Sequence, residues 1–75
     1  NYNMPKPFSL RKLLKILKER GFFLVSQKGS HVKYKNNEDP ELTVIVPEHG
    51  KEIPHGTLRS ILRQAQIDFK DLDNK

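Results

Sequence analysis

Residues 22–35, Phe-Phe-Leu-Val-Ser-Gln-Lys-Gly-Ser-His-Val-Lys-Tyr-Lys, decide the fold. Residues 22–27 are rich in β-branched and aromatic side chains, and residues 31–35 alternate polar with apolar ones, which is typical of strands. The connecting Lys28-Gly29-Ser30 is short and contains glycine, as hairpin turns commonly do. The stretch therefore predicts a β-hairpin.

A third strand is expected after the hairpin. Residues 36–41 are polar and acidic and include Pro40, so they predict a loop. Residues 42–46, Leu-Thr-Val-Ile-Val, predict a strand that Pro47 should end, because proline cannot donate to a ladder from a strand interior. Three strands at such short spacing indicate one antiparallel meander.

Two amphipathic helices are expected on either side of the strands. The first covers residues 9–20, with Ser9 as N-cap, leucines at spacings of three and four, and Gly21 as the left-handed residue that ends it. Residues 48–56 contain glycine and proline and predict an ordered loop. Thr57 is then expected to cap a second helix with apolar residues Leu58, Ile61, Leu62 and Ala65, and Phe69 and Leu72 to form one further turn.

The order α-β-β-β-α predicts an α+β fold, with both helices on one face of a three-stranded antiparallel sheet and the other face open to solvent. No linker divides the chain, so we expect one domain over residues 1–75, with residues 1–7 a flexible leader or tag remnant. There is no cysteine and no signal-peptide segment, and no apolar run nears the ~20 residues of a membrane span. We therefore expect a cytoplasmic protein without a membrane partner.

The positive charge lies mostly in the first half of the chain. Residues 1–35 hold nine Lys and Arg against one acidic residue, a balance of +8, whereas residues 36–75 hold five against eight, a balance of −3. A basic half on a small domain is typical of a surface that binds a polyanion such as nucleic acid. A solvated helix face with ordinary solubility charges is the plainer interpretation.

One group of residues has the chemistry for RNA cleavage. Alternation along residues 31–35 places His31, Lys33 and Lys35 on the open face, with Val32 and Tyr34 toward the helices. Imidazole transfers protons near neutral pH, and ammonium groups stabilise charge that develops on phosphate oxygens. The 2′-hydroxyl of RNA supplies the nucleophile, so no metal is required. A strand histidine flanked by lysines is nevertheless more often a solvated surface residue, and by itself it does not identify an enzyme.

The remaining candidates are weaker. His49 and His55 lie in turn contexts, and their spacing from His31 matches no metal-binding motif, so we expect neither a metal nor a cofactor. Lys28 and Arg59 are candidates for phosphate contacts, Arg59 because helix N-termini favour anions. Both also fit solvated surface positions.

Residues 27–34, Gln-Lys-Gly-Ser-His-Val-Lys-Tyr, resemble the G-S-H-x-x-aromatic motif of HicA toxins, the RNase partners in HicA–HicB toxin–antitoxin pairs. Residues 20–22, 46–53 and 56–65 agree with the same family in order and spacing, so the resemblance covers about residues 10–68. It implies a fold like that of a double-stranded-RNA-binding domain and a toxin that cleaves mRNA. It also implies a HicB-like antitoxin that covers the catalytic histidine. The catalytic histidine of the family corresponds to His31, and the turn residues of the family motif correspond to Gly29 and Ser30.

The sequence supports two candidate functions. The first is a type II toxin acting as a metal-independent endoribonuclease, with His31 as general acid or base and with RNA contacts from Lys28, Gly29, Ser30, Lys33, Lys35 and, more distantly, Arg59. The alternative is a non-catalytic module that binds double-stranded RNA by its shape and phosphates. Such modules carry a lysine cluster where residues 55–59 here hold one cation, which argues against the alternative. The chain also departs from the family at Gln66, where glycine is common.

Overall fold

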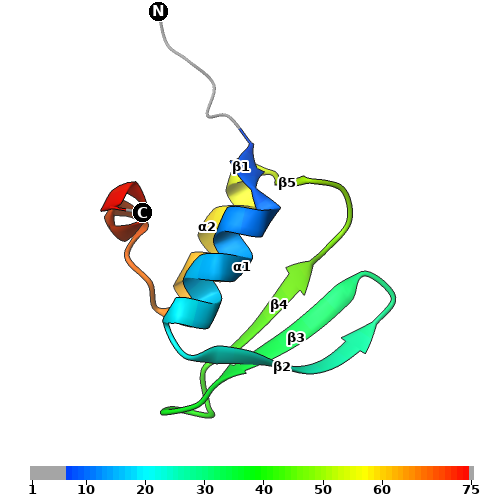
Figure 1. Ribbon diagram of the computed structural model, residues 1–75, viewed down its shortest axis with the longest axis vertical. Helices are drawn as coiled ribbons and strands as arrows, with labels where there is room; N and C mark the ends of the chain where they lie inside the picture. The colour runs from blue at the N-terminus through cyan, green and yellow to red at the C-terminus, as the bar shows by residue number, and fades with distance from the viewer. Residues whose placement is uncertain (1–6, 75) are drawn as a thin grey trace, which may run out of the picture.

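The computed structural model describes residues 7–74 and forms two layers (Figure 1). The expected leader at residues 1–7 lies outside this range except for Pro7. In chain order the elements are β1 (Phe8–Ser9), α1 (Leu10–Glu19), β2 (Phe22–Lys28), β3 (His31–Asn36), β4 (Thr43–Pro47), β5 (Glu52–Ile53), α2 (His55–Ala65) and the 3₁₀ helix η1 (Phe69–Asn74).

The main sheet is antiparallel, with strand order β2-β3-β4 and β3 in the centre. Helices α1 and α2 lie side by side over one of its faces (Figure 1). The core between the layers is apolar, with fully buried side chains from both helices and from β4 that include Leu13, Leu17, Leu58, Ile61, Val44 and Val46. The predicted α+β fold, with two helices on one face of a three-stranded sheet, is confirmed.

Both ends of α1 follow the sequence prediction. The Lys12 N–H donates to Ser9 Oγ at 3.1 Å, which is the N-cap bond. At the other end Gly21 has φ +90°, a conformation that favours glycine, and a Cβ there would lie 2.6 Å from Asn37 Oδ1, so the Asn37 side chain would have to move. The buried Asn36 side chain donates to the Arg20 carbonyl at 2.9 Å and thereby ties the end of α1 to the end of β3.

The prediction that Thr57 caps the second helix is wrong. Helix α2 begins three residues earlier than predicted, at His55, and its N-cap is Pro54, which makes no side-chain cap bond. Proline suits this position because its φ of −59° is already near the helical value and its carbonyl accepts the Leu58 N–H at 2.9 Å. Thr57 therefore lies inside the first turn.

The expected loop at residues 48–56 contains more structure than the sequence indicated. Its residues Glu52–Ile53 form β5, which pairs antiparallel with β1 through Phe8 opposite Ile53. His55 and Gly56 belong to α2.

The third strand is shifted by one residue from its predicted range, because it starts at Thr43 rather than Leu42 and ends at Pro47 rather than Val46. The Ile45 N–H points away from β3 and donates to Gln64 Oε1 at 3.3 Å. The backbone nitrogen of Pro47, two residues further along the strand, faces the same way. Because this nitrogen does not face β3, the missing N–H of proline removes no hydrogen bond between β4 and β3.

The further turn expected around Phe69 and Leu72 is present as η1, with Leu72 buried. Arg20 at the end of α1 forms a 3.1 Å salt bridge with Asp71 and holds η1 against the helix layer. None of the helices within residues 7–74 has the length and apolar character needed to span a membrane.

Candidate functional site

The open face of the sheet is a grid of three rows across β2, β3 and β4. Strand pairing sets each row, with a β3 residue in the middle. From the turn outward the rows are Lys28–His31–Pro47, Ser26–Lys33–Ile45 and Phe23–Lys35–Thr43. We call these nine residues the open face.

The predicted division of β3 between the two faces agrees with the burial of its side chains. His31 and Lys33 are exposed and Lys35 is half-buried, whereas Val32 is buried and Tyr34 is half-buried against the core. The acidic loop after β3 lies at the far end of the hairpin, because Asn36 pairs with Phe22 and His31 pairs with Lys28. Its carboxylates therefore do not approach His31.

A β-bulge in β2 decides which β2 side chains join the open face. The register shifts between Leu24 and Ser26, so Val25 is an extra residue opposite Lys33. Without this extra residue, strict alternation would place Phe23 and Lys28 on opposite faces. With it, both lie on the face that carries His31.

The turn before His31 is held from both sides. Gly29 has φ +60° at the first of the two turn positions, where a type II′ hairpin requires a positive value. The Gln27 side chain donates to the Gly29 carbonyl at 3.0 Å, and the backbone N–H of Glu48 donates to the Ser30 carbonyl at 2.6 Å. The turn residues Gly29 and Ser30 are thus fixed relative to both β2 and the segment after β4.

Glu48 also binds a side chain beneath the turn. The Tyr34 hydroxyl, on the helix side of β3, donates a hydrogen bond to the Glu48 carboxylate. Burial of the phenol, this hydrogen bond and the negative charge of Glu48 together raise the pKa of Tyr34 well above its usual range. No local sequence pattern marks Glu48, because its role depends on contacts with residues 14 and 18 positions away.

Among the described residues, no salt bridge joins a lysine of the open face to an acidic side chain. Within the described part of the chain the salt bridges join Arg20 with Asp71 and Lys70 with Asp68. Lys28 and Lys33 therefore present ammonium groups without a salt-bridge partner beside His31, and Lys35 presents one two rows away. This arrangement is suited to binding phosphate.

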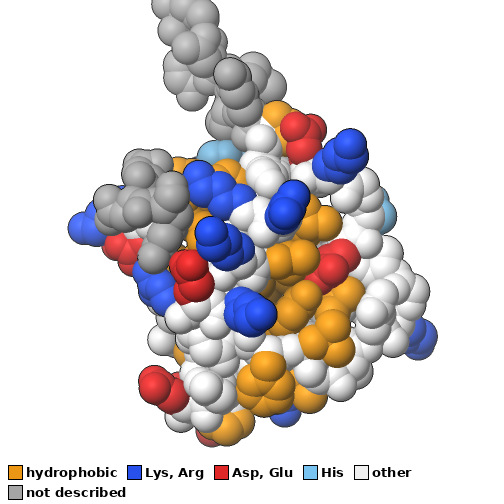
Figure 2. All heavy atoms as spheres, viewed as in Figure 1, with side chains coloured by type: hydrophobic (Ala, Val, Ile, Leu, Met, Phe, Trp, Pro, Cys, Tyr) orange, Lys and Arg blue, Asp and Glu red, His pale blue; other side chains and the backbone are white. Residues whose placement is uncertain are grey.

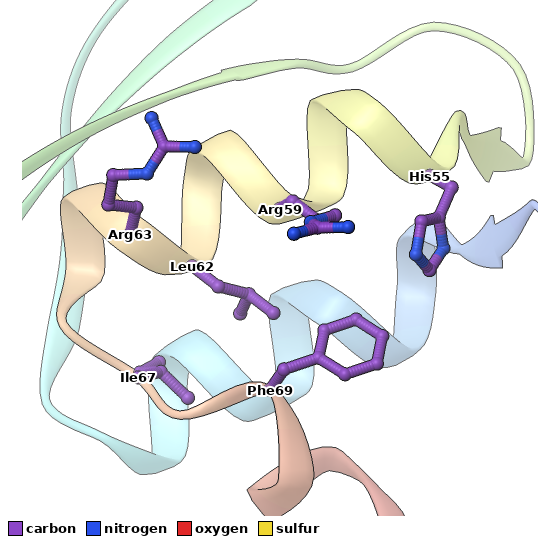
Figure 3. A pocket seen from close by; sticks show the side chains of 6 residues that line it. All are labelled: His55, Arg59, Leu62, Arg63, Ile67 and Phe69. Carbon is purple, nitrogen blue, oxygen red and sulfur yellow. The ribbon is translucent and has the colours of Figure 1, made fainter.

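Arg59 does not lie near His31. It is on α2, beside a depression of about 390 Å³ between α2 and η1 (Figure 3). The hairpin turn and η1 lie at opposite sides of the molecule (Figure 1).

In the part of the chain that the structure describes, the other two histidines do not form a group with His31 that could hold a metal. In the depression the His55 ring meets Phe69 edge-on, with 5.3 Å between ring centroids, so His55 has a packing role. His49 is exposed in the loop after β4. Over residues 7–74, no three His, Asp or Glu side chains are grouped so that they could hold a metal.

The fold and its open face define a small α+β domain with a basic, histidine-bearing sheet surface. The family model of the HicA toxin of bacterial toxin–antitoxin systems matches residues 10–67, from the start of α1 to just beyond α2. The chain therefore belongs to the HicA toxin family, which implies a toxin with an antitoxin partner. A comparison with curated proteins found no match.

Proposed function

We propose that this toxin is an endoribonuclease that cleaves mRNA without a metal ion, with His31 as its general acid or base. The observation that carries the proposal is the position of His31 in the first row of the open face. There it pairs with Lys28 and lies two residues from Lys33, beside a turn that is held from both sides. This places a proton-transfer group among unpaired cations on an accessible surface.

The chemistry needs few protein groups. The 2′-oxygen of the RNA attacks the adjacent phosphorus, the new bond forms as the bond to the 5′-oxygen breaks, and a cyclic phosphate and a free 5′-hydroxyl result. His31 either takes the proton of the 2′-hydroxyl or gives one to the leaving 5′-oxygen. Lys28 and Lys33 stabilise the negative charge on the non-bridging oxygens.

The turn allows the phosphate to come close. A Cβ at Gly29 would meet nothing within 4 Å, so the space above the turn is open. Gly29 and Ser30 therefore contact the RNA backbone in this proposal, and Lys35 extends the cationic row away from the turn. Arg59 is a contact only for RNA that reaches around to α2.

The test compares two histidines. His31→Ala should lose about 10²–10⁴-fold in cleavage rate, the usual contribution of general acid–base catalysis. His49→Ala, which removes another exposed histidine, should cleave as the wild type does. Circular dichroism should show both variants folded. Full activity in folded His31→Ala would contradict the proposal.

One observation favours the alternative of a non-catalytic double-stranded-RNA-binding module. Lys and Arg side chains also gather over the helix layer (Figure 2), and α1 presents exposed Arg11, Lys12, Lys15 and Lys18. Such a surface suits contacts to duplex phosphates. Strongly salt-dependent binding to duplex RNA by a chain that cleaves no RNA would support this function instead.

We also propose that the antitoxin is HicB-like and covers His31 with an acidic surface, since such a surface complements the basic open face. Because the RNA target is mRNA, both proteins act in the cytoplasm in this account. The double variant Lys33→Glu with Lys35→Glu should weaken antitoxin binding. Unchanged antitoxin affinity would exclude the open face as the interface.

A further inference from the structure

An aromatic side chain lies exposed on the open face. The Phe23 side chain is 49% exposed and pairs with Lys35 in the third row, and Ile45, opposite Lys33, is 37% exposed. Phe23 has no polar atom that would explain its exposure by a hydrogen bond. The face that carries the candidate catalytic histidine therefore combines apolar surface with unpaired cations.

We propose that Phe23 stacks on a base of the bound RNA, while Lys33 and Lys35 contact the phosphates of the same, locally single-stranded, segment. This inference rests on the proposed function, because it takes RNA as the substrate. Aromatic rings beside a cationic track are how proteins hold single-stranded nucleic acid, since every base has a face that stacks.

The exposed ring of Phe23 favours a single strand over a duplex, because a base that is paired and stacked inside a duplex cannot stack on a side chain. His31, Lys33 and Lys35 are two residues apart, so successive rows are separated by about 7 Å. That separation is comparable to the distance between neighbouring phosphates along a nucleic-acid strand, so a strand that follows the rows advances one nucleotide per row. Its bases are free for protein contacts only where the strand is not paired in a duplex.

This register assigns a position to the stacked base. With the scissile phosphate at the His31 row, the Phe23 row lies two rows away. The base on Phe23 therefore belongs to a nucleotide two positions from the cleavage site. Phe23 is a positioning residue here, because it binds the strand and transfers no proton.

The other large exposed apolar side chains of the described residues differ from Phe23 in position or type. Leu24, 53% exposed, pairs with Tyr34 on the opposite face of the same strand. Phe69 packs against His55 on α2. Leu24 is consequently a matched control for Phe23, since it is a neighbour of similar exposure that points away from the RNA.

The experiment measures binding rather than cleavage. In a His31→Ala background, which leaves the RNA intact, affinity is measured for a short single-stranded oligouridylate. Phe23→Ala should bind about tenfold more weakly, within the usual range for loss of one base–aromatic stack. Phe23→Trp should keep the affinity, and Leu24→Ala should change it less than twofold.

An abasic oligonucleotide of equal length separates stacking from other effects. Because it has phosphates but no bases, Phe23→Ala and its parent should bind it equally. Equal binding of the oligouridylate by both would overturn the inference, and so would an equal loss from Leu24→Ala. If Phe23→Ala weakened only antitoxin binding, the ring would be a protein contact and the inference would fail.

Failure of the inference is distinguishable from failure of the proposed function. If RNA cleavage requires His31 but RNA affinity does not depend on Phe23, the stacking inference alone is overturned. Absence of both RNA binding and RNA cleavage in the folded wild type would overturn the two together.

Discussion

Tyr34 and Glu48 form a hydrogen bond beneath the hairpin turn, with the phenol hydroxyl as donor and the carboxylate as acceptor. Through its backbone N–H, Glu48 also binds the carbonyl of Ser30, the residue before His31. One residue of the segment after β4 thus links the helix side of the sheet to the turn. This link reaches the backbone directly before His31.

Glu48→Ala should lower the cleavage rate about tenfold. The variant keeps the backbone N–H that binds Ser30 but loses the carboxylate that ties Glu48 to Tyr34, so the Glu48 backbone is held less firmly against the turn, and misplacement of a reacting group by about 1 Å is already costly. The loss should appear mainly in kcat, with KM little changed, since the cationic face remains. Glu48→Gln keeps an acceptor for Tyr34 and should recover most of the rate. Equal loss in both variants would show that the charge, rather than the link, matters.

The raised pKa of Tyr34 predicts a pH effect on stability. Below the ordinary phenol value of about 10, the hydroxyl is protonated in both folded and unfolded chains, and its contribution to stability is complete. As the pH rises above that value toward the higher pKa of the folded state, the unfolded chain releases the proton first, so the contribution is lost. Tyr34→Phe has no such proton.

The measurement is urea unfolding of the wild type and Tyr34→Phe from about pH 7 to about pH 11. The wild type should be more stable by about 1 kcal/mol at neutral pH, the usual value of one hydrogen bond. The difference should shrink above about pH 10. A difference that stays constant or grows there would contradict the assignment.

The salt dependence of RNA binding should distinguish the two basic surfaces. For single strands each phosphate contact contributes about 0.7 to the slope of log affinity against log salt. Lys33→Gln with Lys35→Gln should therefore lower that slope by about 1.4. Lys15→Gln with Lys18→Gln, on α1, should leave it unchanged. The reverse result would assign RNA binding to the helix layer.

Gln66→Gly should stabilise the fold by about 1 kcal/mol, because Gln66 has φ 57° in the left-handed region, where side chains are strained. The Ile67 N–H donates to the Leu62 carbonyl at 2.9 Å and closes the helix end, so the conformation must be kept. Thermal unfolding measures the gain. Arg63→Gly, within the helix, should instead destabilise by about 1 kcal/mol. A loss of stability in Gln66→Gly would contradict this account of the helix end.

Local patterns in the sequence were sufficient for the hairpin, the first helix and the β3 side of the open face. Ser9 and Gly21 set the ends of α1 through contacts with near neighbours, and alternation set the directions of His31 and Lys33. The glycine that the resemblance led us to expect at position 66 corresponds to the left-handed residue that ends α2. In each case the residue's conformation depends on its immediate neighbours.

The rest of the site depends on longer-range geometry. The bulge at Val25 moves Phe23 and Lys28 onto the same face, and no local pattern marks that extra residue. Glu48 acts through distant partners, and the two-residue strands β1 and β5 are too short for any periodicity. At α2, Thr57 was the predicted N-cap, whereas the helix has Pro54 as its N-cap without any side-chain cap bond.

The central claim, that His31 catalyses RNA cleavage without a metal ion, is tested most directly by an RNA cleavage assay with the purified wild type in excess EDTA. The His31→Ala variant is assayed alongside. A fully 2′-O-methylated RNA of the same sequence serves as a second substrate. We expect the wild type to cleave the unmodified RNA in EDTA and to leave a cyclic phosphate. His31→Ala should be inactive, and the methylated RNA should remain intact. Wild-type activity that EDTA abolishes and a divalent metal restores would contradict the claim, as would cleavage of unmodified RNA by folded His31→Ala.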